Sequence, residues 1–121
     1  MLELILCASL MVIDGDNVRC DGVNLRILGD GAPDIVGVDA PEIDWRADCD
    51  YEIQLGQQAT ERLAQLIQTP GLVIEDSGEI DHFERPLVTL RLPDGQTAGQ
   101  VLIDEGLAVE WTPEYTANWC D

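Results

Sequence analysis

The sequence predicts a small α+β domain, compatible with a Greek-key β-barrel that is capped by helices. Two observations predict it. Short runs of aliphatic and β-branched residues alternate with turns rich in Gly, Asp and Pro, as in a sheet of short strands. Two segments with helical spacing of apolar residues interrupt the order of strands. Since 121 residues suffice for one modest core and not for two, residues 1–121 are expected to form a single domain.

Three strands are expected before the first helix. They cover Leu4–Ile13, Val18–Cys20 and Val23–Leu28. Turn residues at 14–16 and 21–22 separate them, which is the arrangement typical of consecutive antiparallel strands.

The first helix is expected over Tyr51–Gln68. Pro70-Gly71 ends it, because proline cannot continue a helix and glycine favours its end. Its apolar residues recur at the spacing of a single helical face. They are Leu55, Ala59, Leu63, Leu66 and Ile67.

Two strands and a second helix complete the expected pattern. The strands are Leu72–Ile74 and Leu87–Leu92, with a polar loop between them. A Pro-Asp-Gly turn then leads to a short helix that contains residues 101–103. Leu107–Trp111 is expected to form a last short strand, and residues 112–121 an irregular tail.

The charge of the chain is strongly negative. Twenty-four acidic residues face six basic ones, all of them arginine, for a net charge of -18. Such a chain repels phosphate backbones and anionic membranes. The acidic residues form a solvated surface, a cation-binding cluster, or both, because a few carboxylates are enough for one site.

Neither a transmembrane helix nor a signal peptide is expected in the chain as given. No run of eighteen apolar residues occurs. The apolar opening carries Glu3 and lacks a basic start, so it is better explained as a buried first strand. The compartment stays open, since a leader trimmed from the chain would place the protein in the periplasm or outside the cell.

The four cysteines do not suggest a zinc site. They show no CxxC spacing, and His82 is the only histidine. Four reduced thiols and two disulfides, which can be paired in three ways, are equally compatible with the sequence.

Three short segments concentrate groups that bind cations or phosphates. Two are acidic, the Asp-Gly-Asp turn at 14–16 and Asp39–Glu42, and the third is the loop Asp81–Arg85. Calcium prefers several carboxylate and carbonyl oxygens, and an arginine fork suits a phosphate group. Each segment alone is ordinary turn chemistry. Their combination is what indicates a site.

The order of motifs resembles the thermonuclease family, the staphylococcal nuclease-like domains. The motifs are VIDGDNVR, LRILG, VDAPE, a helical LGQQA, DHFERPLV and VLIDEGLA, and the likeness covers about residues 11–111. It implies a five-stranded OB-type Greek-key barrel with two or three packed helices. It also implies calcium-dependent hydrolysis of phosphodiester bonds in DNA or RNA, leaving 3′-phosphates.

The resemblance assigns roles to individual residues. Asp16 and Asp39 look like the carboxylates that bind calcium, and the carbonyl of Ala40 stands where the family adds a backbone ligand. Glu42 looks like the carboxylate that orients or deprotonates the attacking water. Arg85 looks like one of two arginines that bind the scissile phosphate and stabilise its developing charge.

The second arginine is displaced by a near-repeat. Residues 27–42 read ILGDGAPD-IVGVDAPE, and the two halves match with a period of eight. The family has an arginine five residues before the calcium aspartate, but Asp34 occupies that position here. Counting forward from Asp16 reaches Arg26 instead, followed by Ile-Leu-Gly as in the family motif.

A local insertion of eight residues reconciles the two counts. We expect the segment near residues 30–37 to loop out, so that Arg26 and Asp39 converge on one site. In the competing interpretation Asp34 takes the place of the arginine, which removes a phosphate contact and adds repulsion.

Two departures from the family weaken the functional expectation. Glu84 stands where the family usually has a glycine, at a turn that requires positive φ. The acidic surface opposes binding of long duplexes, so weak, ion-dependent binding of short or single-stranded nucleic acid is expected. The alternative is a weakened or inactive nuclease-like barrel that binds calcium or a partner protein. A metal-independent interaction domain is a third interpretation.

Overall fold

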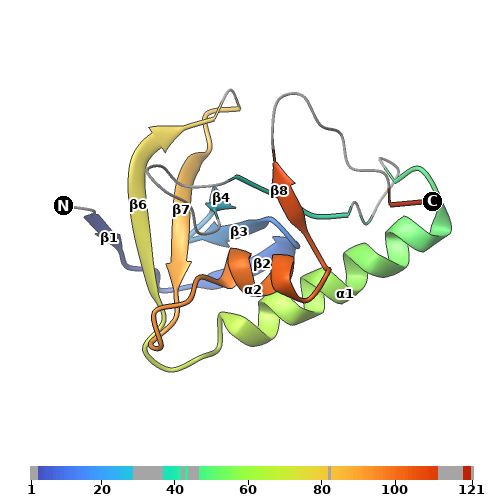
Figure 1. Ribbon diagram of the computed structural model, residues 1–121. Helices are drawn as coiled ribbons and strands as arrows, with labels where there is room; N and C mark the ends of the chain where they lie inside the picture. The colour runs from blue at the N-terminus through green and yellow to red at the C-terminus, as the bar shows by residue number, and fades with distance from the viewer. Residues whose placement is uncertain are drawn as a thin grey trace.

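The computed structural model describes residues 3–28, 37–41, 43, 47–81, 83–111 and 119–120, without the side chains of residues 37, 39 and 111. Within them the fold is α+β (Figure 1). The strands are β1 (Glu3–Ile5), β2 (Leu10–Asp14), β3 (Asn17–Cys20), β4 (Val23–Leu28), β5 (Gly37–Asp39), β6 (Val73–Ile80), β7 (Pro86–Arg91) and β8 (Val109–Trp111), and the helices are α1 (Asp50–Leu66) and α2 (Ala98–Asp104).

Six strands form one mixed sheet in the order β1-β6-β7-β4-β3-β2. The β4–β7 pair is parallel and the other neighbours are antiparallel. β5 joins β4 at a single pair, Leu28 with Gly37, and then pairs with β8. Because Leu28 also faces Thr89 of β7, β5 lies on the β3 side of β4.

The expected closed five-stranded barrel is not what the structure shows. Among the described strands, β1 and β2 lie at the two ends of the sheet order and do not pair with each other. Four residues, 6–9, separate these strands in the chain, so the two ends are within about 19 Å of each other. The sheet is therefore curled but open.

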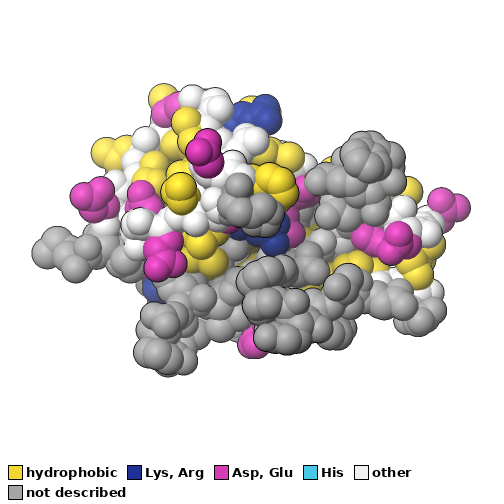
Figure 2. Space-filling view, turned by 90° about the horizontal axis from the view of Figure 1, so that it is seen from above, with side chains coloured by type: hydrophobic (Ala, Val, Ile, Leu, Met, Phe, Trp, Pro, Cys, Tyr) yellow, Lys and Arg dark blue, Asp and Glu magenta, His cyan; other side chains and the backbone are white. Residues whose placement is uncertain are grey.

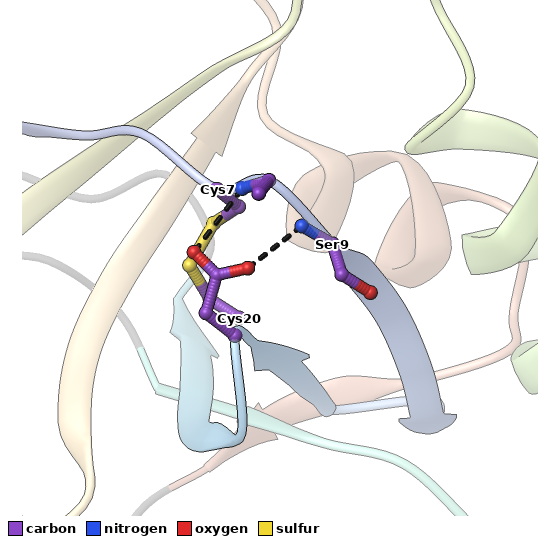
Figure 3. Close-up of a disulfide and its surroundings, with 5 residues drawn as sticks. Cys7, Ser9 and Cys20 are labelled. Atoms are coloured by element: carbon purple, nitrogen blue, oxygen red, sulfur yellow. Dashed lines mark hydrogen bonds between the residues drawn. A yellow bond between two sulfur atoms is a disulfide. The ribbon is translucent and has the colours of Figure 1, made fainter.

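The sheet stays open because of contacts made by the segment between β1 and β2. The expected strand 4–13 is interrupted at residues 6–9, where Cys7 forms a disulfide with Cys20. Asp21 accepts hydrogen bonds from the amides of Ala8 and Ser9, at 3.1 and 2.7 Å (Figure 3). These contacts divert the backbone from the ladder, so β1 pairs with β6 whereas β2 pairs with β3.

The four cysteines form two disulfides, whereas the sequence left their redox state and pairing open. Besides Cys7–Cys20, Cys49 at the start of α1 is bonded to Cys120 near the end of the chain. The chain terminus and the beginning of α1 accordingly lie side by side (Figure 1).

The core lies between the sheet and the two helices. α1 packs on β2, and α2 packs on β7, β4 and α1. The apolar face expected for the first helix is confirmed at Ala59 and Leu63, which are fully buried. Other core side chains with no more than 2% exposure come from the sheet and α2. The larger ones are Val18, Leu25, Ile27, Val38, Val88, Leu90 and Leu102.

Two elements differ from the expectation. β6 continues to Ile80 through residues predicted as a polar loop, with an irregular register between Asp76 and Ile80 at Gly78, whose φ is +83°. β5 was not predicted, since its three residues lie inside a turn-like motif. No helix in the described part of the chain is long and apolar enough to cross a membrane.

Candidate functional site

A polar cavity of about 450 Å³ lies where the 14–16 turn meets β3, β4 and the loop before β7. It brings together segments that are far apart in the sequence. Its lining consists of Asp14, Asp16, Asn17, Asn24, Arg26, Phe83 and Arg85. Three of the predicted site residues, Asp16, Arg26 and Arg85, thus share one cavity.

Asp16 is almost completely buried, with 5% exposure. Its Oδ1 accepts a hydrogen bond from Asn17 Nδ2 at 2.7 Å, and its Oδ2 accepts one from the Ala40 amide at 3.0 Å. Arg26 Nη2 lies 3.4 Å from the same Oδ2. Burial raises the pKa of Asp16 well above its ordinary value; Arg26 opposes this increase and Asp14 adds to it.

Gly15 allows the turn to lie against its neighbours. A Cβ at this position would be 2.7 Å from the Cβ atoms of both Ala40 and Ala59. Contacts that short do not occur between real side chains, so no larger residue fits without movement of α1 or of the segment after β5. Gly15 therefore fixes how closely Asp16 approaches Ala40.

Arg26 contacts β5, which lies in the second half of the near-repeat. Leu28 at the end of β4 is paired with Gly37 at the start of β5, so these two positions of the near-repeat lie side by side in the sheet. Arg26 Nη2 donates a hydrogen bond to the Val38 carbonyl at 2.6 Å. The arginine thus contacts the residue directly before Asp39. The competing residue Asp34 lies outside the described residues.

Arg85 enters the cavity from the other side. Its Nη1 donates to Asn17 Oδ1 and its Nε to Asp81 Oδ2, both at 2.8 Å, and its guanidinium lies 5.2 Å from the Phe83 ring centre. Partial burial works to raise the pKa of Asp81. Hydrogen bonds from the backbone and side chain of Arg85 and from the Phe83 amide outweigh it, so this pKa is lowered. Glu84 adopts the expected positive φ, at +63°.

The remaining predicted residues are only partly described. The backbone of Asp39 pairs with Val109, but its side chain is outside the description, as is all of Glu42. Ala40 is 3% exposed, and its amide binds Asp16. His82 also lies outside the described residues.

The charge arrangement fits a divalent cation. Asp14 and Asp16 are each 5% exposed, and the Asn17 amide bridges them at 3.0 and 2.7 Å. These two adjacent carboxylates bring several oxygen atoms to one place, and a hard divalent cation prefers such oxygens as ligands. Among the described residues, no group of three or more His, Cys, Asp or Glu side chains gathers at one place. A complete ligand set therefore also requires the residues at 39–42.

Asn17 is the residue that sequence reasoning missed. It joins both carboxylates to Arg85 and is 7% exposed. An Asn after Asp-Gly-Asp is an ordinary turn residue, so no pattern in the sequence singles it out.

Replacement of Asp16 by Asn is expected to stabilise the protein in chelator. The neutral amide removes a buried charge next to Asp14, which is expected to raise the free energy of unfolding by about 1 kcal/mol. This corresponds to an increase of about 3–5 °C in Tm for a domain of this size. The pKa of Asp16 is higher in the folded state than in the unfolded chain, so the ionised carboxylate destabilises the folded state at neutral pH. This cost disappears as the pH falls through the raised pKa and the carboxylate is protonated.

Thermal unfolding with chelator and with calcium checks this expectation. Calcium should raise the Tm of the unmodified protein and not that of Asp16→Asn. Glu79→Gln, the same chemical change at an exposed position of β6, serves as the control and should leave both values unchanged. A lower Tm for Asp16→Asn in chelator would show that the carboxylate is a net stabilising group.

The sequence was also compared with known proteins. A family model described as staphylococcal nuclease homologue matches residues 34–119. A search of the curated proteins found no match. The matched range contains Asp39, Ala40, Glu42 and Arg85, whereas Asp16 and Arg26 precede it. In the structure, these two residues contact the matched segment directly, at Ala40 and Val38.

Proposed function

Because this chain belongs to the staphylococcal nuclease homologue family, we propose that it is a calcium-dependent nuclease. It hydrolyses phosphodiester bonds of DNA or RNA and leaves 3′-phosphates. One observation carries the proposal. Two arginines and the two buried carboxylates of the 14–16 turn line one cavity, where Asn17 joins both carboxylates to Arg85 and Arg26 lies beside Asp16.

Each residue has a proposed part in the reaction. Asp16, Asp39 and the carbonyl of Ala40 hold calcium, which polarises a phosphoryl oxygen when it is bound. Arg26 and Arg85 bind the phosphate and stabilise the charge that develops on its oxygens. Both arginines already lie at the cavity, at 19% and 24% side-chain exposure, so little reorganisation is needed to reach a substrate.

Glu42 is the proposed general base for the attacking water. It is two residues after Ala40, so the chain cannot place its Cα more than about 7 Å from the Cα of Ala40. Pro41 between them is fully buried and restricts the backbone. Ala40, from which this distance is measured, is itself anchored on Asp16 by its amide, and this supports the proposal.

The surface charge limits the substrates. Acidic side chains are spread over the described surface in Figure 2, and arginine side chains occupy few places. A long duplex would bring many phosphates against this surface, whereas a short or single strand needs contacts only near the cavity. We therefore propose weak binding of short or single-stranded nucleic acid.

End-labelled single-stranded DNA and RNA, incubated with the full chain in calcium or in chelator, test the proposal. Fragments are expected in calcium alone, and a phosphatase should remove phosphate from their 3′ ends. Equal cleavage in chelator would contradict the role of calcium. If the phosphatase instead removes phosphate from the 5′ ends of the new fragments, cleavage does not leave 3′-phosphates, and the proposed position of the broken bond is wrong.

One observation favours a second candidate function. Both site arginines are engaged by carboxylates, Arg26 by Asp16 and Arg85 by Asp81, at 3.4 and 2.8 Å. A domain whose site arginines are occupied in this way would bind calcium or a partner without cleaving nucleic acid. Calcium binding measured by calorimetry, together with no cleavage of either strand, is the result expected for this alternative.

A further inference from the structure

One described arginine differs from the others in its partner. Arg19 on β3 is exposed, and its Nε donates to the amide oxygen of Asn24 at 2.8 Å. Each of the other described arginines has a carboxylate within 4 Å. These pairs are Arg26–Asp16, Arg62–Glu105, Arg85–Asp81 and Arg91–Glu75. Within the described part of the chain, Arg19 therefore retains a positive charge that no neighbouring carboxylate cancels.

Arg19 lies on the same face of the sheet as the cavity. In the β3–β4 ladder, Asn17 faces Arg26 and Arg19 faces Asn24. Since side chains alternate along a strand, these four share one side of the sheet, and the intervening Val18 is buried on the other. Asn17, Asn24 and Arg26 line the cavity. The polar face thus continues from the cavity to Arg19 without interruption.

We propose that Arg19 and Asn24 form a second phosphate subsite for a polynucleotide strand. This inference rests on the proposed function, because the strand's scissile phosphate would lie between Arg26 and Arg85. The guanidinium of Arg19 would bind a phosphate next to it along the strand. Asn24 lines the cavity and its oxygen accepts the hydrogen bond from Arg19 Nε, so it holds that guanidinium next to the cavity.

The spacing suits neighbouring phosphates of one strand. Arg26 and Arg19 are diagonal neighbours across two antiparallel strands, and such pairs are about 7–8 Å apart. Phosphates of a stacked strand advance about 3.4 Å along the axis, but they lie farther apart than that because the backbone also winds around the axis. Two long arginine side chains at this spacing can therefore each contact one of two neighbouring phosphates. Met11, which faces Arg19 from β2 and is 54% exposed, offers an apolar surface to an unstacked base.

The test compares Arg19→Gln with Arg62→Gln in the full chain. Both substitutions remove one charge from an arginine, and Arg62 lies on α1, paired with Glu105. Two substrates are used in calcium, a single-stranded oligonucleotide and a nucleoside ester that carries one phosphodiester. Binding of the oligonucleotide is also followed by fluorescence anisotropy over a range of salt concentrations.

Arg19→Gln is expected to raise the KM for the oligonucleotide and its Kd roughly two- to fivefold, as for loss of an exposed ion pair. The slope of log Kd against log salt should fall by about 0.7, the value for one phosphate of a single strand. The KM and kcat for the one-phosphate ester should not change. Arg62→Gln should leave all of these values as in the unmodified protein.

Three results would overturn the subsite. The first is that Arg19→Gln and Arg62→Gln change the KM and Kd for the oligonucleotide equally. The second is that Arg19→Gln raises the KM for the one-phosphate ester as much as that for the oligonucleotide, and the third is that the unmodified protein does not bind the oligonucleotide. Failure of the proposed function looks different, because the unmodified protein then binds the oligonucleotide and cleaves neither substrate. In that case the loss of affinity and of salt slope in Arg19→Gln still supports the subsite, and unchanged values overturn it.

Discussion

Replacement of Glu42 by Gln is expected to lower kcat for single-stranded DNA by a factor of about 10²–10⁴, the usual contribution of a general base. Glutamine has nearly the same shape as glutamate but cannot accept the proton of the attacking water. Ala40 is held by Asp16 and Pro41 is fully buried, so the backbone that leads to residue 42 does not depend on the charge of its side chain. Tm and calcium affinity should therefore change little.

Single-turnover cleavage in saturating calcium measures this loss, and calorimetry measures calcium binding by the same variant. Glu61→Gln is the matched control, since it makes the same change at an exposed position of α1. Unchanged kcat in Glu42→Gln would assign the base to another group. Loss of calcium affinity together with activity would make Glu42 a calcium ligand instead of a base.

Local sequence patterns predict the parts of this fold that depend on local contacts. The periodic apolar face identifies α1, and Asp21-Gly22 identifies the turn between β3 and β4. β5 escapes prediction because its three residues are paired mainly with β8, about seventy residues further along the chain. A pairing over that distance leaves no pattern within the strand itself.

The open sheet has a similar explanation. The apolar run from Leu4 to Ile13 is typical of one strand, and nothing within it indicates the break at residues 6–9. The break depends on the bond between Cys7 and Cys20, which spacing alone does not predict. Asp21 reinforces the break through two backbone amides, a role that its turn position does not reveal.

The candidate site was predictable where residues could be counted against a motif. Counting from Asp16 selected Arg26, and the structure places its guanidinium on the Val38 carbonyl. Asn17 was not predictable, because its importance comes from contacts with groups on three different segments. Motifs identify the charged groups, whereas the neutral side chains that orient them become apparent only in the folded structure.

Replacement of Arg26 by Ala is expected to lower kcat/KM for single-stranded DNA by a factor of about 10²–10³, the usual cost of losing one donor to a transition-state oxygen. Nη2 makes both contacts described above, with Val38 and Asp16, so the fork has further N–H donors to direct at a phosphate. Arg85→Ala should cause a loss of similar size. Steady-state cleavage of one labelled oligonucleotide by each variant measures both effects.

Arg26 also stabilises the fold locally through its hydrogen bond to the Val38 carbonyl. A control must therefore separate this structural contribution from binding of phosphate. Arg26→Lys keeps the charge beside Asp16 but cannot form a bidentate fork. Arg26→Lys should therefore lower the Tm less than Arg26→Ala does, while its kcat/KM stays as low as that of a variant without the fork. Full activity in Arg26→Ala, with none in Arg85→Ala, would show that Arg26 is not the second phosphate arginine. Counting from Asp39, which reaches Asp34, would then describe this site correctly, and the eight-residue segment would have removed a phosphate contact.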